Sequence, residues 1–275
     1  MKKRSSEQPV VLPNQIAGRM PKGQQEYFGL SSQPLHILIF LLPIILAYEI
    51  GSMGLLDGEG GRLVAQKMLV QFFDLFGVLG LHLPALALVI TLGVQHFLSR
   101  ASWRVVPMVP LAMIVESAFL TGPLIVLWLI LSPQGGGFAV QDGAMQAAVM
   151  QGVEVAKEGV SQGVLMSLGA GLYEEMLFRL VMITILHFMV TDVMGFKDKT
   201  GKVVAVVCSA AAFAWFHNAI HTATGLDIRL ALFLTLAGVY FGILFLARGL
   251  GIAVGVHLMY DLLAIVIIPG IQGES

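Results

Sequence analysis

The chain contains a series of apolar runs, each about as long as the hydrocarbon core of a bilayer is thick. A helix needs about 20 apolar residues to cross that core, and in lipid every backbone polar group must find its partner within the helix or a closed barrel. The runs lie near 35–55, 80–98, 105–131, 161–190, 202–220, 229–247 and 250–268. The sequence therefore predicts an all-α fold, a polytopic membrane helix bundle with about seven transmembrane helices.

The composition agrees with a chain that folds in lipid. Of its 275 residues, 57% are hydrophobic and 12% are charged, whereas soluble domains carry about 25% charged residues. This excludes an ordinary water-soluble globule, and the net charge of -1 provides no basic surface for nucleic acid. We expect an integral, multi-pass membrane protein that contacts the lipid bilayer and binds no nucleic acid.

Three regions follow from the distribution of the apolar runs. Residues 1–30 are mostly polar and are predicted to form a flexible N-terminal tail. Residues 31–160 hold the first three transmembrane helices together with two interfacial segments, because 59–78 has the mixed pattern of an amphipathic helix and 142–160 suits a second surface helix. Residues 161–270 hold the last four spans, in which several ionisable residues recur at helical spacing.

Lysine and arginine are distributed unevenly between the segments that connect the spans. One set of alternate segments, starting with the N-terminal tail, holds Lys2, Lys3, Arg4, Arg19, Lys22, Arg100, Arg104, Lys197, Lys199, Lys202 and Arg248. The other set holds fewer basic residues. By the positive-inside rule we expect a cytoplasmic N-terminus, and because no eukaryotic hallmark is present we expect a bacterial cytoplasmic membrane.

The first group of ionisable residues comprises Glu174, Glu175 and Arg179. Charged groups at membrane depth are costly and rarely persist without a partner or a function. Residues i and i+4 are neighbours on a helix, so Glu175 and Arg179 can pair along one face. The alternative is that this ion pair is purely structural and holds helices together. Glu174 points about 100° away, so we expect it to face a polar cavity as a general base. Residues 161–190 form either one long tilted helix or two helices.

The second group places Phe213 one turn before His217. With a rise of about 1.5 Å per residue, His217 and Glu174 lie at similar depths in antiparallel spans, so they can meet. Phe213 suits packing against the imidazole, and a purely structural histidine is the alternative. His221 could join His217 at a metal, but Asn218 stands where a His-Glu-x-x-His pattern has its glutamate. We therefore place His221 at a water-facing helix end.

The third group is His257 and Asp261, one helical turn apart in the last span. A carboxylate there can orient the imidazole, or both groups can point at one reacting oxygen. A structural hydrogen bond between them is the alternative. Two further acids lie in the first and third spans, Glu49 and Glu116. Each could support a site, although a contact between helices is the favoured interpretation.

In this order the three groups resemble the CPBP family of intramembrane proteases, which includes the Rce1-type CAAX prenyl proteases and bacterial Abi-like proteins. The family pattern is Glu-Glu-x-x-x-Arg, then Phe-x-x-x-His, then His-x-x-x-Asn or Asp. It corresponds here to residues 174–179, 213–217 and 257–261. The resemblance implies that 161–270 forms the CPBP-like catalytic helices of an intramembrane endopeptidase.

The resemblance also implies roles for individual residues. Glu174 and His217 would activate the water that attacks the scissile amide. His257 with Asp261 would stabilise the oxyanion or orient the groups that do. The implied supporting residues are Glu175, Arg179 and Phe213. The substrate would be a membrane-associated peptide or protein, of CAAX type or another.

The catalytic type stays open at this point. Where family enzymes often have asparagine this chain has Asp261, and an ionised aspartate cannot donate a hydrogen bond. Glu174, His217 and His257 could bind Zn²⁺ with one position open for water, so a metalloprotease is an alternative to a glutamate protease. We favour no cofactor.

Two functions of other classes fit the same residues. The first is a non-catalytic immunity or scaffold protein that keeps the fold and binds a peptide. The second is a proton-coupled transporter in which Glu174, Glu116 and Asp261 form a relay, although the inverted repeat typical of such transporters is not evident.

Overall fold

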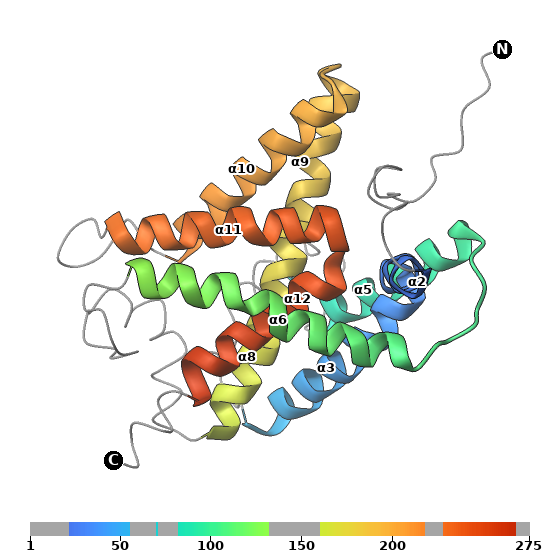
Figure 1. The fold of residues 1–275 in the computed structure, drawn as a ribbon, viewed down its shortest axis with the longest axis horizontal. Helices are drawn as coiled ribbons and strands as arrows, with labels where there is room; N and C mark the ends of the chain where they lie inside the picture. Colours follow the sequence, from blue (N-terminus) through green and yellow to red (C-terminus); the bar gives the residue numbers. More distant parts are fainter. Residues whose placement is uncertain (1–21, 56–69, 71–81, 132–159, 218–227, 268–275) are drawn as a thin grey trace.

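The computed structural model describes residues 22–55, 70, 82–131, 160–217 and 228–267 of the chain (Figure 1). Every regular element in these ranges is a helix, which confirms the predicted all-α class. The elements, with π-helices marked η, are α2 (Lys22–Ser31), α3 (Pro34–Leu55), α5 (Leu83–Ser99), α6 (Met108–Leu131), α8 (Val160–Glu175), η2 (Met176–Ile183), α9 (Thr184–Phe188), η3 (Met189–Val193), α10 (Asp198–Phe216), α11 (Ile228–Arg248), α12 (Leu250–Asp261) and η4 (Leu262–Ile267).

Several of these helices are long and apolar enough to cross a membrane. Those that meet both criteria are Pro34–Ser52, Met108–Leu131, Gly163–Val193, Asp198–Phe216 and Ile228–Arg248. Two shorter apolar helices, Leu83–Ser99 and Leu250–Ala264, stand at the other two predicted spans. The predicted polytopic bundle is therefore confirmed. The predicted interfacial segments 59–78 and 142–160 lie outside the described residues, except for residues 70 and 160.

One continuous helix carries the tandem glutamates. It runs from Val160 to Val193 through α8, η2, α9 and η3, so the single long helix is the correct one of the two alternatives. The change from α to π geometry falls directly after Glu175. Short π segments inside α-helices are rare and are frequent at functional sites. In Figure 1 the α9 end of this helix and α10 form a hairpin that extends away from the other helices.

The N-terminal region differs from the prediction. Residues 22–30 were expected to belong to a flexible tail, but they form most of α2. The prediction was wrong here because Tyr27 and Leu30 give this short, mostly polar helix an apolar side that packs against the core. Residues 1–21 lie outside the described part of the chain.

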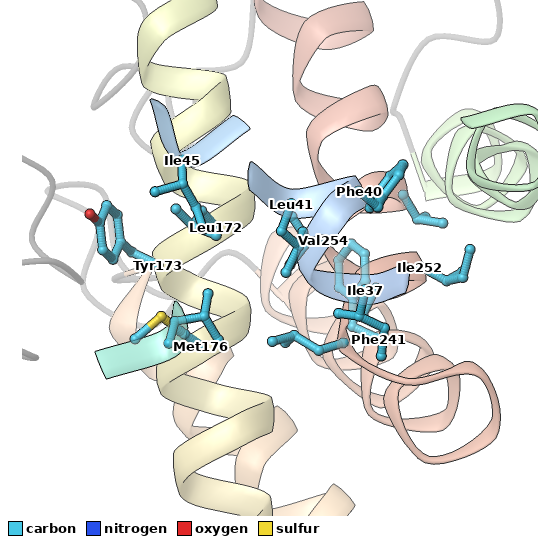
Figure 2. Close-up of a cluster of buried hydrophobic side chains, with 14 of the residues drawn as sticks. Ile37, Phe40, Leu41, Ile45, Leu172, Tyr173, Met176, Phe241, Ile252 and Val254 are labelled. Atoms are coloured by element: carbon cyan, nitrogen blue, oxygen red, sulfur yellow. The ribbon is translucent and has the colours of Figure 1, made fainter. Parts of the chain in front are cut away.

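The main core lies where α3, α8, α11 and α12 meet. Figure 2 shows part of it, with apolar side chains from these helices directed toward one another. The labelled members are Ile37, Phe40, Leu41, Ile45, Leu172, Tyr173, Met176, Phe241, Ile252 and Val254. Close approach of α8 and α12 depends on Gly171, because a Cβ at this position would lie 3.0 Å from the backbone nitrogen of Leu258. This packing sets the last turn of α8 beside the C-terminal half of α12, where the predicted site residues lie.

Candidate active site

The tandem glutamates end α8 and are both withdrawn from solvent. Glu174 is 7% exposed and Glu175 is 0% exposed. Arg179, four residues further along, is also 0% exposed, and its Nη1 atom lies 3.0 Å from Oε1 of Glu175. The predicted pair is therefore present, although the helix between the two residues has π geometry.

The arginine has further contacts that offset the cost of its burial. Its Nη2 atom donates a hydrogen bond of 3.4 Å to the carbonyl oxygen of Gly238. The guanidinium also lies 4.5 Å from the ring centroid of Phe213 and 5.0 Å from that of Phe241. Cation–π contacts of this kind gain strength when the groups are desolvated. Arg179 thus joins the helix of the glutamates to α10 and α11.

His257 on α12 is held by Glu175, which the sequence pattern paired with Arg179. Its Nδ1–H donates a 2.7 Å hydrogen bond to Oε1 of Glu175, the same oxygen that faces Arg179. Asp261, the predicted orienting group, has its Oδ2 atom 3.6 Å from Nε2 of His257, which is beyond direct hydrogen bonding. The Phe241 ring stacks on the imidazole at a centroid distance of 4.8 Å. Glu175 and Phe241 therefore set the orientation of His257.

His217 approaches from α10. The prediction placed it inside a span over 202–220, but α10 ends at Phe216 and His217 is its C-terminal cap. Its Nδ1–H donates to the carbonyl oxygen of Phe213 at 2.9 Å, and the Phe213 ring packs on the imidazole at 4.4 Å. Because Nδ1 is engaged locally, Nε2 is the atom turned to the site, and it lies 3.4 Å from Oε2 of Glu174.

The same oxygen of Glu174 is the centre of the cluster. It lies 3.8 Å from Nε2 of His257, which in turn lies 3.6 Å from Asp261. Oε2 of Glu174 is buried and has no hydrogen-bond partner among the described residues. Buried polar atoms are almost always satisfied by protein or by ordered water. Oε2 of Glu174 thus lies within 4 Å of the Nε2 atoms of both histidines, and Asp261 reaches the cluster through His257.

An aromatic layer closes one side of the cluster. Phe178 packs edge-to-face on Phe213 and on Phe216, with ring centroids 5.4 and 5.3 Å apart. Beyond them, the Phe233 ring lies 6.0 Å from that of Tyr260, the residue before Asp261. These rings belong to a buried cluster formed by the long glutamate-bearing helix, α10 and α11. Through Phe213, which packs on His217, this cluster borders the ionisable groups.

The fit of a metal can be judged from the donor atoms. Glu174, His217 and His257 offer one oxygen and two imidazole nitrogens, which are ligand types that zinc accepts. Within the described ranges, however, no group of three or more histidine, cysteine or acidic residues has the geometry of a metal site. We therefore derive no step through a metal. His221, the other predicted metal candidate, lies outside the described residues.

The two further acids both join helices, as the favoured interpretation predicted. Glu116 accepts hydrogen bonds of 2.7 and 2.8 Å from the Nε and Nη2 atoms of Arg248. It also accepts one of 2.5 Å from the Tyr27 hydroxyl. Glu49 contacts the hydroxyl of Tyr173, the residue directly before Glu174, and its other oxygen contacts His82. Glu49 is therefore linked to the site through one neighbour, which the sequence pattern did not indicate.

Comparison with protein families identifies a similarity in the C-terminal part of the chain. Residues 157–263 match the Rce1-like family, described as type II CAAX prenyl endopeptidase Rce1-like. The match includes all three motifs, so the resemblance seen in the sequence is confirmed for this part of the chain. Comparisons with curated proteins and with solved structures give no significant match. The family and the long apolar helices together make the chain an integral membrane protein.

Proposed function

We propose that the protein is an intramembrane endopeptidase acting on a membrane-associated peptide or protein, because residues 157–263 match the Rce1-like family of type II CAAX prenyl endopeptidases. The observation that carries the proposal is the buried Oε2 atom of Glu174, which lies 3.4 Å from Nε2 of His217 and 3.8 Å from Nε2 of His257. A carboxylate between two imidazoles can hold a water and take its proton.

The hydrolysis begins with a water bound between Glu174 and the two histidines. Glu174 removes a proton from this water, and the oxygen attacks the carbonyl carbon of the scissile amide. His217 shares the proton with Glu174, since its Nε2 atom lies 3.4 Å from the carboxylate. When the tetrahedral intermediate collapses, the C–N bond breaks and the same proton passes to the leaving amine. One water is consumed, and a new carboxyl and a new amine are produced.

His257 acts on the other side of the intermediate, as the donor to the oxyanion. Its Nδ1–H is fixed by Glu175, so its Nε2 atom is the one directed to the reacting oxygen. Glu175, 2.7 Å from Nδ1, supplies the negative charge for an imidazolium, and Asp261 lies on the Nε2 side of the ring. Donors fixed in advance in a site that excludes water stabilise developing charge most effectively. Asp261 itself acts through His257 rather than as a donor.

The substrate must reach a site that lies below the membrane surface. Glu174 is 11 positions after Gly163, where the apolar part of its helix begins, and this corresponds to about 16 Å at 1.5 Å per residue. The substrate is therefore itself membrane-associated, whether a lipidated CAAX-type tail or a transmembrane segment. The distribution of Lys and Arg supports a cytoplasmic N-terminus.

The proposal is tested with a library of membrane peptides and the full-length protein in detergent. Glu174→Gln is isosteric and should abolish cleavage while the protein still folds. Asp192→Asn is a matched control, because Asp192 is an exposed acid on the same helix, and it should cleave at the wild-type rate. Cleavage that survives Glu174→Gln would disprove the proposed role. Peptide binding without cleavage by the wild type would favour the non-catalytic alternative.

A further inference from the structure

The acid of the first span, Glu49, contacts a residue beside the site although the proposed reaction does not use it. One of its carboxylate oxygens accepts a hydrogen bond from the Tyr173 hydroxyl, and the other contacts Nδ1 of His82. The side chain of Glu49 is 12% exposed, whereas that of His82 is 49% exposed. A carboxylate within a span needs such partners. The pair of contacts ties α3 both to α8 and to the residue that precedes α5.

Tyr173 occupies the last turn of α8, directly before Glu174. Its ring is fully buried and packs edge-to-face on Tyr48, with the ring centroids 5.2 Å apart. Figure 2 shows its hydroxyl directed away from the labelled apolar side chains of the core. Successive helical residues differ by about 100°. A contact at Tyr173 therefore fixes the rotation of the turn that carries Glu174.

This turn requires such a contact because the helix changes geometry there. From Met176 onward the helix has π geometry, so regular α-helical hydrogen bonds do not continue past the acids. On the α12 side the turn is held by Glu175, through His257. On the α3 side it is held by Glu49 through Tyr173. Gly51, two residues after Glu49, packs closely against Leu165 on the same helix as Tyr173.

We propose that Glu49 is a positioning residue for hydrolysis. Through Tyr173 it fixes the rotation of the last turn of α8, and thereby the direction of the Glu174 carboxylate toward His217 and His257. The inference rests on the proposed function, since it assigns a task relative to that reaction. A displacement of about 1 Å in a reacting group can lower the rate about 10²-fold.

The test removes the hydrogen bond from either side. Tyr173→Phe removes the donor, Glu49→Ala removes the acceptor, and Glu49→Gln keeps an acceptor oxygen. In Tyr173→Phe and Glu49→Ala we expect kcat to fall by about tenfold to about 10²-fold, the upper value being that of a displacement of about 1 Å. KM should stay unchanged. Glu49→Gln should restore most of the rate, and the double variant should be no slower than the singles, because both remove one interaction.

The matched control is Tyr27→Phe. It removes the hydrogen bond that Tyr27 donates to Glu116, which is also a tyrosine–glutamate bond but lies in a different part of the bundle. It should leave kcat at the wild-type value. A rate in Glu49→Gln as low as that in Glu49→Ala, or an equal loss in Tyr27→Phe, would overturn the positioning role.

A second measurement does not depend on activity. Hydrogen exchange of the backbone amides of 172–179, measured by mass spectrometry on the full-length protein, should be faster in Tyr173→Phe and Glu49→Ala than in the wild type, Glu49→Gln or Tyr27→Phe. If Glu174→Gln is inactive but all Glu49 and Tyr173 variants keep wild-type kcat, Glu49 has no positioning role and the proposed function stands. If the wild type cleaves nothing, the proposed function fails, and unchanged exchange would then refute the fixing of this turn as well.

Discussion

The Nδ1 atom of His257 lies 2.7 Å from Oε1 of Glu175, a residue 82 positions earlier in the chain. Because the same oxygen lies 3.0 Å from Nη1 of Arg179, one carboxylate both neutralises a buried guanidinium and fixes an imidazole of the candidate site. The neighbouring Glu174 contacts two histidines, whereas the ion pair with Arg179 is formed by Glu175. The two adjacent glutamates are therefore expected to respond differently to substitution.

The first prediction concerns the division between folding and chemistry. Arg179→Leu leaves the Glu175 carboxylate buried without its cation, and breaking a buried pair in this way costs roughly 3–5 kcal/mol. We expect a lower unfolding temperature and reduced yield for Arg179→Leu, measured by thermal unfolding in detergent. Glu174→Gln should unfold like the wild type and lose activity. An equal loss of stability in both variants would show that Glu174 is structural as well.

The second prediction concerns Asp261. Since its Oδ2 atom lies 3.6 Å from His257, outside direct hydrogen bonding, a neutral side chain of the same size should replace it. Asp261→Asn should retain most of the proteolytic activity, measured with and without chelator. If Asp261 instead supports a metal, the loss should be about 10–100-fold. Stoichiometric zinc in the wild type together with such a loss would overturn the metal-free mechanism.

A third prediction separates the partly buried ion pair of Arg248 and Glu116 from the site. Arg248 binds Glu116 through two hydrogen bonds and also donates to the Ser31 hydroxyl, so it fastens α2 and α11 to α6. Arg248→Met should lower stability toward the lower end of about 3–5 kcal/mol, because both side chains are partly exposed. Thermal unfolding checks this value. At temperatures where the variant is folded, kcat should equal that of the wild type, and a fall in kcat would connect this pair to the site.

The fourth prediction is a pH dependence of stability that depends on Tyr27, which lies before the first span. Burial and the hydrogen bond to Glu116 raise the pKa of Tyr27 above its ordinary value of 10.0. Between pH 10 and the raised pKa the unfolded chain loses this proton while the folded chain keeps it, so stability falls as the pH rises. The difference in unfolding free energy between wild type and Tyr27→Phe should be constant below pH 10 and shrink above it. A constant difference up to pH 11 would contradict the prediction.

Much of the site could be predicted because its residues follow helical spacing. The i,i+4 relation of Glu175 and Arg179 was sufficient to predict their ion pair, and the order of the spans brought Glu174 to His217. The roles of these residues in hydrolysis stay predictions. The contact of Glu175 with His257 was not predictable from spacing, because it depends on how α8 and α12 are rotated against each other.

The errors in the fold have similar causes. Apolar runs indicate which residues lie in lipid, but they do not show where a helix ends when its last turn is capped locally, as at His217. They also do not indicate π geometry, which begins directly after Glu175. Helix α2 was missed because its attachment depends on Arg248 and Glu116, both distant in sequence from Tyr27.

The shared oxygen of Glu175 limits how this protein can evolve. A lineage can change its reaction through Glu174 or Asp261, since each can be exchanged without removing the counterion of a buried cation. It cannot change Glu175 in the same way, because every substitution that frees His257 also leaves Arg179 uncompensated. Selection for a stable membrane protein and selection for an ordered imidazole therefore act on a single atom. A variant that has lost proteolysis for other reasons would still be expected to keep Glu175.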